Sequence, residues 1–417
     1  MSPIRVCAVT CDCYPEDPLV RRTAEAGVSA YEYHVLCSMA EGETPYEVFN
    51  GVHVHRIRIN RHGKAMGRIT AMSFVQTIYY WTLFTFLAAF RLLKLHRKYK
   101  FDVIHIHNLP DYLVFAAFFP KMMGAQVILQ IQDITPELMA VKSSGFSGRM
   151  AVLLAKWQER MSTAFADHVL TVGWPFEPPL LERGVPREKL SSVLNSADPS
   201  IFREDKRTPL YVGDATPERP IVLMYHGTMA ARNGIDTAIR AFAKAHAVAP
   251  YLQLHLNGDG EALPGLKQLA KELGVADQVV FFPRRPLHKL ADFVSSGDIG
   301  IIPYPTDGFM ELVLPTKSYE YAQMRRPMIA SDTIAIRSLF RPESVMLCEP
   351  ANPDSFAQAI VDLYQHPAKR AELMDNATQD YAEFRWEFQA ERYRALIASL
   401  AEKRAEKAGL KSVGITE

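Results

Sequence analysis

The sequence predicts two Rossmann-like, doubly wound α/β domains that face each other across a cleft. Three observations lead to this expectation. The chain has 417 residues, more than one hydrophobic core usually serves. Short apolar runs alternate with longer helical patterns, as they do in the βα units of parallel sheets. A polar stretch with several prolines and charges, at 203–219, interrupts this alternation, which then starts again.

Each half contains its own set of expected strands. They are residues 4–10, 32–37, 52–57, 103–107, 126–130, 168–172 and 192–194 in the first half, and 221–225, 252–257, 279–282, 299–303, 328–330 and 345–347 in the second. Helical patterns at 234–247 and 262–273 separate strands of the second half. Apolar residues recur at helical spacing from 386 to 400, and we expect this last helix to pack back on the N-terminal domain.

The expected division follows from these patterns. It comprises an N-terminal domain at 1–203, a linker at 204–219, a C-terminal domain at 220–378, a crossover helix at 379–404 and a polar tail at 405–417.

Composition restricts the partners and the compartment. The 47 Lys and Arg residues balance 46 Asp and Glu residues, so no global field favours nucleic acid. The odd count of five cysteines, with no basic-then-apolar leader, favours reduced thiols in the cytoplasm. Cys11 and Cys13 lack the second pair of ligands that a zinc site usually needs, and we expect no metal.

One segment has the composition of a membrane-active helix. Residues 69–90 carry no charge and many aromatic side chains, and basic residues follow as far as Lys100. The segment lies between two expected strands of one sheet, so a spanning helix is disfavoured. Two interpretations stay open: a buried crossover helix, or an interfacial helix that makes peripheral membrane contact through 69–100 at the inner face of the membrane.

Two motifs of the second half describe an anion site. In the first, a strand runs into a turn at Gly227, which lets a phosphate approach the backbone, and Arg232 supplies a fork of donors. In the second, Pro315 suits the first position of a helix, so the nearby amides are free to bind an anion and Lys317 adds charge. Glu320 follows one turn later, where its carboxylate can accept from the hydroxyls of a ribose.

Polar residues also follow two expected strands of the first half. Asn108 and Asp111 come after one strand, and Gln132, Asp133 and Glu137 come after the next. Ligands of open α/β sheets bind at the carboxyl ends of the strands, so we expect substrate to bind here. For the nearby histidines we expect His105 to be a core residue and leave His107 open between core and site.

Several motifs together resemble those of family-4 retaining glycosyltransferases, which have the GT-B fold. They are the HGT loop at 226–228, the NGDG turn at 257–260, the FFPRR strand exit at 281–285, the LPTKSYEY run at 314–321, and HIHNLPD at 105–111 with QDITPE at 132–137. The resemblance implies a hexosyltransferase-type enzyme that moves a sugar from a nucleotide diphospho-sugar to an acceptor hydroxyl, with retention and without a metal. It implies no further cofactor, and we expect the acceptor to be a lipid-linked glycan of polysaccharide biosynthesis.

The resemblance also assigns roles to residues. Arg232 and Lys317 would neutralise the diphosphate, Glu320 would bind ribose, and the backbone around Pro283 and Arg285 would flank the base. The remaining donor contacts would come from Gly227, Thr228, Leu314, Pro315 and Thr316. Glu311 would lie near the donor sugar, and Asp133 is the fallback general base.

The chain departs from the common family pattern at three places. Glu311 and Glu320 enclose eight residues instead of seven, and Thr228 and Asn233 stand where many members have Arg and Lys. Gln132 stands where many relatives have a histidine, so it can hydrogen-bond a sugar hydroxyl but cannot shuttle a proton.

Two alternatives to transfer remain at this point. One is epimerisation or hydrolysis of a nucleotide sugar within the same fold. The other is a non-catalytic, nucleotide-sugar-binding subunit of a membrane assembly. A dinucleotide dehydrogenase is disfavoured because neither half has a G-x-G-x-x-G turn after its first strand.

Overall fold

The computed structural model describes residues 3–59, 74–142, 145–407 and 409, and the chain forms two compact units. Unit 1 comprises Met1–Leu194 with Glu387–Glu417, and unit 2 comprises Asn195–Trp386. Residues 69–73 of the expected 69–100 helix, and residues 408 and 410–417 of the expected tail, lie outside the described residues.

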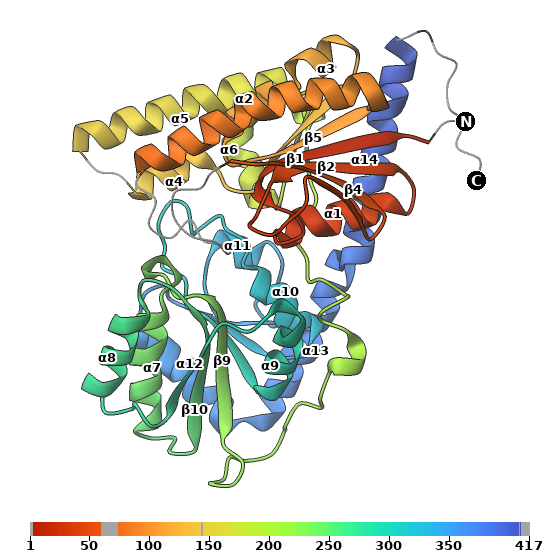
Figure 1. Ribbon diagram of the computed structural model, residues 1–417. Helices are drawn as coiled ribbons and strands as arrows, with labels where there is room; N and C mark the ends of the chain where they lie inside the picture. The colour runs from red at the N-terminus through yellow and green to blue at the C-terminus, as the bar shows by residue number, and fades with distance from the viewer. Residues whose placement is uncertain (1–2, 60–73, 143–144, 408, 410–417) are drawn as a thin grey trace. The chain divides into compact units, whose positions relative to one another are not determined.

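Unit 1 is built on an eight-stranded sheet in the order β3-β4-β2-β1-β5-β6-β7-β8 (Figure 1). The strands are β1 (Arg5–Cys13), β2 (Glu32–Ser38), β3 (Tyr46–Phe49), β4 (Val52–Ile57), β5 (Val103–His107), β6 (Gln126–Ile131), β7 (His168–Thr171) and β8 (Leu190–Ser192). The expected strands are present, the last one shifted to Leu190–Ser192. The strand β3 was not expected; it pairs antiparallel with β4 through a turn at Asn50 and Gly51, both with positive φ.

Helices cover both faces of this sheet. They are α1 (Pro18–Val28), α2 (Phe74–Tyr99), η1 (Asp111–Ala117), α3 (Phe118–Met122), α4 (Thr135–Lys142), α5 (Gly145–Phe165), α6 (Glu177–Glu182) and α14 (Trp386–Lys407). Tyr393 of α14 hydrogen-bonds to Tyr33 at 2.6 Å and to His105 at 2.9 Å. His34 follows Tyr33 in β2, so its side chain points to the opposite face of the sheet. On that face it packs against Tyr99 of α2. The C-terminal helix therefore returns to the N-terminal unit, as the sequence predicted.

Unit 2 is a parallel six-stranded sheet in the order β11-β10-β9-β12-β13-β14. Its strands are β9 (Ile221–Thr228), β10 (Leu252–Asp259), β11 (Val279–Phe282), β12 (Ile299–Ile302), β13 (Met328–Ser331) and β14 (Met346–Cys348). Its helices are α7 (Ile235–His246), α8 (Leu263–Glu272), α9 (Leu290–Ser296), α10 (Thr316–Gln323), α11 (Ile334–Arg337), α12 (Pro353–Gln365) and α13 (Pro367–Tyr381). α7 packs against α12, and Phe242 and Phe356 join the strands in one core.

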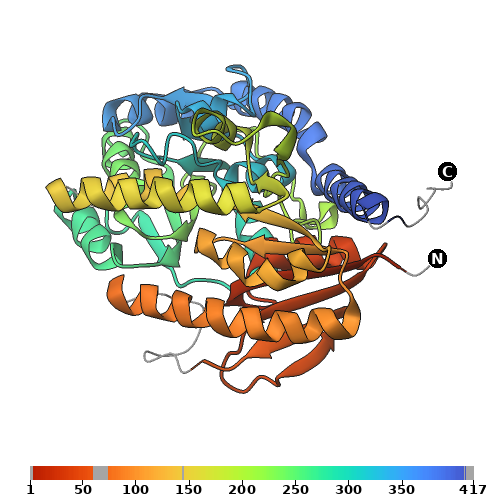
Figure 2. The same ribbon diagram turned by 90° about the horizontal axis from the view of Figure 1, so that it is seen from above.

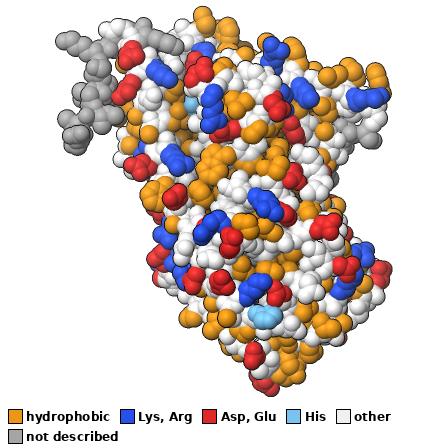
Figure 3. Space-filling view, turned by 180° about the vertical axis from the view of Figure 1, so that it is seen from behind, with side chains coloured by type: hydrophobic (Ala, Val, Ile, Leu, Met, Phe, Trp, Pro, Cys, Tyr) orange, Lys and Arg blue, Asp and Glu red, His pale blue; other side chains and the backbone are white. Residues whose placement is uncertain are grey.

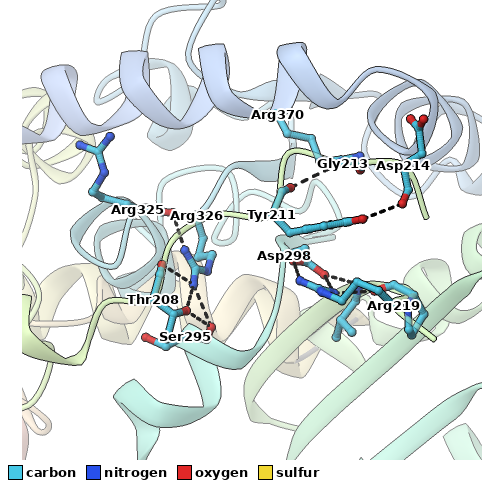
Figure 4. Close-up of polar contacts among 12 residues, drawn as sticks. Thr208, Tyr211, Gly213, Asp214, Arg219, Ser295, Asp298, Arg325, Arg326 and Arg370 are labelled. Atoms are coloured by element: carbon cyan, nitrogen blue, oxygen red, sulfur yellow. Dashed lines mark hydrogen bonds and ion pairs between the residues drawn. The ribbon is translucent and has the colours of Figure 1, made fainter. Parts of the chain in front are cut away.

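The segment 204–219 is fixed to unit 2 by buried arginines (Figure 4). Arg326 donates to the carbonyl of Thr208 at 3.0 Å, and Arg370 donates to the carbonyl of Gly213 at 2.6 Å. Both arginines are fully buried, and each also binds further carbonyls of unit 2. The polar segment therefore follows the surface of unit 2 and is not a free tether.

Candidate functional site

The two motifs of unit 2 meet where its strand order reverses. From β9 the chain builds β10 and β11 on one side, and then β12, β13 and β14 on the other. Gly227 lies at the carboxyl end of β9, and α10 follows the loop after β12. In open α/β sheets, ligands bind in the crevice outside the strands at such a switch point. The fold therefore places both motifs at the expected ligand position.

Glycines keep the backbone open at this position. Gly227 has a φ of +135°, which L side chains rarely adopt, and a Cβ there would lie 3.5 Å from Nζ of Lys317. A Cβ on Gly258, in the neighbouring strand β10, would meet the carbonyl oxygen of Gly227 at 1.9 Å. A ligand can therefore approach the main chain of residue 227 directly beside the ammonium group of Lys317.

The loop after Gly227 is held by Asn233, which stands where many family members have a lysine. Asn233 is buried, and its amide donates to the carbonyl of Thr228 at 2.6 Å. Gly234 has a φ of +65°, and a Cβ there would meet the carbonyl oxygen of Pro303 at 1.8 Å. Arg232 is exposed and makes no hydrogen bond or ion pair within the described part of the chain. Its guanidinium is therefore available to an anion.

Lys317 is a buried cation at the centre of the site. Its Nζ donates to the hydroxyl of Tyr304 at 2.9 Å and lies 4.9 Å from the ring centroid of Tyr225. Burial lowers the pKa of Lys317, but Tyr225, Tyr304 and Glu320 together raise it above its usual value, so the ammonium group stays charged. Among the described residues no carboxylate lies within ion-pair distance of Nζ. A buried charge without a counter-ion favours an anionic ligand.

Glu320 is oriented by His226, a residue of the HGT motif to which no role was assigned from the sequence. Nε2 of His226 hydrogen-bonds to Oε2 of Glu320, which joins the end of β9 to α10. His226 is buried, and the edge of its ring packs against Tyr321. Glu320 is the more exposed partner. We therefore describe His226 as a positioning residue for the Glu320 carboxylate.

The helix after Leu314 begins one residue later than expected. Pro315 is the N-cap residue in an extended conformation, and Thr316 is the first residue of α10. The amides of Thr316 and Lys317 therefore belong to the first turn, where no intrahelical carbonyl is available to them. This correction keeps both amides as candidate donors to an anion.

Glu311 has a structural contact. Its Oε1 accepts from the amide of Ile334 at 3.0 Å, and its carbonyl accepts from the amide of Ala335 at 3.1 Å. Glu311 therefore ties its loop to the start of α11.

Arg285 borders the site with a planar surface. Its guanidinium lies over the rings of Phe282 and Phe293, at 5.2 Å and 5.5 Å from their centroids. Asn257 donates to the carbonyl of Pro283 at 2.9 Å and fixes the strand exit before it. Backbone and stacked surfaces of this kind can bind a flat base without reading its identity.

The polar residues of unit 1 are organised by Asn108. Its Nδ2 donates to Asp111 at 2.8 Å and to the carbonyl of Asp133 at 2.9 Å, and its Oδ1 accepts from the amide of Gln132 at 2.7 Å. Four of the five predicted substrate-side residues are therefore brought together at the ends of β5 and β6.

Asp111 is enclosed within this group. Its side chain is buried and also accepts from Thr135. Burial raises the pKa of Asp111 to about 6, and the hydrogen bonds from Asn108 and Thr135 oppose that shift. Asp111 therefore holds the side chain of Asn108 in place. Asp133 is more exposed than Asp111.

Glu137 is held by an ion pair with Arg183. Arg183 binds Glu137 at 2.7 Å and the buried Glu159 at 2.5 Å. This pairing has no signal in the sequence, because Arg183 lies 46 positions from Glu137 and belongs to no motif.

The two histidines of β5 are neutral. Burial lowers the pKa of His105 to about 3, and burial together with His105 lowers the pKa of His107 well below its usual value. His105 binds Tyr393, so it is a core residue as expected. Nδ1 of His107 lies 3.2 Å from Nε2 of Gln132, so the neutral imidazole can accept from that amide and orient it.

In the part of the chain that the structure describes, no three His, Cys, Asp or Glu side chains are grouped as metal ligands. Cys11 and Cys13 are buried and form no disulfide within the described residues.

Three features of the chain define the GT-B class of glycosyltransferases. They are two α/β units built on mainly parallel sheets, polar groups at the carboxyl ends of the central strands in each unit, and a last helix that returns to the first unit. The family comparison agrees with this class. Residues 18–195 match the model described as "Glycosyl transferase 4-like domain", and residues 220–366 match the model "Glycosyl transferases group 1". The chain belongs to the family-4 glycosyltransferases of the GT-B fold.

Curated relatives include an alpha-D-kanosaminyltransferase of Streptomyces kanamyceticus, 25% identical over 63% of this chain and 68% of the relative. A D-inositol 3-phosphate glycosyltransferase of Thermomonospora curvata is 26% identical over 56% of this chain and only 57% of its own length.

Solved structures share the fold at lower identity. Sucrose-phosphate synthase of Thermosynechococcus elongatus has a TM-score of 0.72 at 18% identity, covering 95% of this chain and 100% of that chain. The Anabaena protein HepE, solved with UDP-glucose, has a TM-score of 0.67 at 14% identity, with the same coverage of both chains.

Proposed function

We propose that this glycosyltransferase moves a sugar from a nucleoside diphosphate sugar to an acceptor hydroxyl, with retention at the anomeric carbon and without a metal. The observation that carries the proposal is the buried, charged Lys317 beside the open backbone of Gly227, with no carboxylate among the described residues at ion-pair distance. A diphosphate supplies the missing negative charge. The complex of HepE with UDP-glucose supports this donor class.

The residues of unit 2 stabilise the leaving group in this mechanism. As the bond between the anomeric carbon and the diphosphate oxygen breaks, negative charge develops on the diphosphate. Lys317, Arg232 and the amides of the first turn of α10 take up that charge in place of a metal ion. Glu320, oriented by His226, accepts from the ribose hydroxyls and fixes the nucleotide.

The new bond forms on the same face of the sugar. The acceptor oxygen attaches to the anomeric carbon, and its proton passes to the departing diphosphate oxygen. This route needs no strong base, which is consistent with a neutral His107 and with glutamine at position 132. Asp133, the more exposed carboxylate of its group, is the alternative proton acceptor. A lipid-linked glycan is the acceptor class that we propose.

The test combines binding and turnover with purified full-length protein. UDP, GDP and ADP and their sugars are first compared by thermal shift, because a ligand that binds only the native state raises its stability. The best donor is then incubated with and without acceptors, with EDTA present, and the product is analysed by NMR.

We expect transfer that survives EDTA and a product with the anomeric configuration of the donor. An inverted product contradicts retention, and loss of transfer in EDTA contradicts the metal-independent route. Donor consumption without acceptor indicates an epimerase or hydrolase, and tight donor binding without turnover indicates a non-catalytic subunit.

A further inference from the structure

Three helices of unit 1 present an apolar outer surface. α2 contacts α3 and η1, η1 contacts α5, and Phe118 of α3 stacks with Phe165 of α5, so the helices form one layer (Figures 1 and 2). Large apolar side chains of this layer are at least 50% exposed, among them Phe86 and Phe90 of α2, Phe119 of α3, and Leu153, Leu154 and Trp157 of α5. We call these six residues the apolar face.

The large apolar side chains of α5 face outward, whereas those of an ordinary surface helix face the core. In α5 these side chains are Leu153, Leu154 and Trp157. The residues that it buries are small or polar, namely Gly148, Ala155, Glu159, Ser162 and Thr163. A helix of a soluble protein turns its apolar stripe toward the core. The sequence of α5 is therefore suited to apolar surroundings on its outer side.

The charges beside the apolar face have one sign. Exposed basic residues are Lys94, Arg97 and Lys98 on α2, and Arg149, Lys156 and Arg160 on α5. The sequences of α2, α3 and α5 contain a single acidic residue, Glu159, which is buried and paired with Arg183. On the face of the molecule seen in Figure 3, by contrast, acidic and basic side chains are interspersed.

We propose that the apolar face docks onto an anionic lipid bilayer and inserts into one leaflet, with the layer of α2, α3 and α5 lying along the membrane surface. Apolar side chains then enter the acyl boundary while the basic residues meet anionic headgroups. The proposal extends the expected contact beyond 69–100 to α3 and α5, and it does not depend on the transfer reaction.

A second copy of the chain is a poorer occupant of this face. A symmetric self-contact would bring Arg149, Lys156 and Arg160 close to their own like charges, which costs binding energy. A spanning arrangement of α2 also fits poorly. By length and composition α2 can cross a membrane from Gln76 to Tyr99, but Phe84 and Leu92 are fully buried in unit 1. Spanning would remove both from the core.

Flotation of the full-length protein with vesicles tests the proposal. We expect binding to phosphatidylcholine vesicles that contain phosphatidylglycerol, and little binding to phosphatidylcholine alone. Leu153→Ser with Leu154→Ser should weaken binding about a hundredfold, because both side chains lose apolar burial. Arg149→Gln with Lys156→Gln should weaken it about thirtyfold. Val212→Ser with Val248→Ser, at exposed positions of unit 2, is the matched control and should bind as the wild type does.

Fluorescence reports insertion directly. Trp157 is 62% exposed, so its emission should shift to the blue on vesicles and be quenched by lipids brominated on the acyl chain. Trp157→Phe should remove most of that quenching. Unchanged thermal unfolding of each variant shows that it is folded, since the substituted side chains are exposed.

Three results overturn the proposal. In the first, the wild type does not bind vesicles. In the second, the α5 variants bind vesicles as well as the control does. In the third, the protein forms a dimer without lipid, and the double variant Leu153→Ser with Leu154→Ser dissociates it. Nucleoside diphosphate binding, followed by thermal shift, is measured in parallel. A protein that binds nucleotide but not vesicles contradicts the membrane surface alone and leaves the proposed transferase function standing.

Discussion

His226 and Glu320 are hydrogen-bonded to each other although 94 positions separate them in the chain. The bond joins the end of β9 to α10, the two elements whose motifs describe the anion site. It occupies Oε2 of the carboxylate, so the side chain has a fixed direction before any ligand binds. Such preorganisation lowers the entropic cost of binding.

Replacement of Glu320 should remove the ability to recognise ribose. Hydrogen bonds to a charged group contribute about 1.5–3 kcal/mol each, so Glu320→Ala should weaken nucleoside diphosphate binding by about ten- to a hundredfold. The sharper measurement compares ribose with 2′-deoxy and 3′-deoxy nucleotides by calorimetry. The wild type should prefer the ribonucleotide, and Glu320→Ala should lose that preference. A preference that survives in the variant contradicts the ribose role.

Replacement of Lys317 should weaken diphosphate binding without substantially lowering the stability of the fold. Lys317→Met removes the buried charge and should weaken diphosphate binding about ten- to a hundredfold. The free energy of unfolding without ligand should stay within about 1 kcal/mol of the wild-type value, because methionine fills a similar volume and the neighbours of Lys317 already offset the cost of burying its charge. Denaturant unfolding and nucleotide titration check both parts, with the exposed Lys271→Met as control. A destabilised variant with normal nucleotide affinity would show a structural role instead.

A side chain at position 227 should be unfavourable for both folding and binding. Gly227→Ala places a Cβ at a φ of +135° and fills the space beside Lys317, so unfolding should become easier by about 1–3 kcal/mol and nucleotide affinity should fall. Gly265→Ala in α8 is the matched control, since a Cβ there meets no atom within 4 Å. Thermal unfolding of the control should occur at the wild-type temperature or above. Equal effects of the two substitutions would contradict this account of the Gly227 loop.

Removal of Arg183 should destabilise unit 1. Arg183→Met leaves the buried Glu159 beside Glu137 without a counter-charge, which costs about 3–5 kcal/mol near neutral pH. Burial already raises the pKa of Glu159 to about 7, so lowering the pH to 5 should protonate it and relieve much of the loss. Arg203→Met breaks an exposed pair with Asp205 and should change stability by less than about 1 kcal/mol. A loss independent of pH would contradict the role of Glu159.

Asp111 should make stability depend on pH in a definite direction. Its pKa is about 6 in the folded protein against 3.8 ordinarily, so the folded state holds the proton more tightly. The free energy of unfolding should therefore fall as pH rises from about 4 to about 6, by up to about 3 kcal/mol from this residue. Asp111→Asn should flatten that part of the curve, measured by denaturant unfolding at each pH. An unchanged slope would contradict the shifted pKa.

Local patterns account for most of what the sequence could predict. Alternating apolar runs indicated the parallel sheets, and Gly227 and Pro315 marked their loops through residue types that such turns require. The hairpin of β3 was also predictable from Asn50 and Gly51, a pair typical of two-residue turns, but short exposed strands give a weak apolar signal.

Pairings between distant residues were not predictable. The ion pair of Arg183 with Glu137 depends on where two helices meet, and a charge in a sequence does not name its partner. The outward face of α5 is a second case, because its apolar periodicity is the same whether the stripe faces a core or a membrane. Only the folded unit shows that Glu159 and Ser162 lie on the buried side of α5.

The return of α14 to unit 1 has a consequence for synthesis. Unit 2 is continuous from Asn195 to Trp386, whereas unit 1 needs Tyr393 to complete the hydrogen bonds of Tyr33 and His105. Domains generally fold in the order in which the ribosome releases them. Here the first domain must wait for the final helix, so the part of the protein that is made first is the part that is finished last.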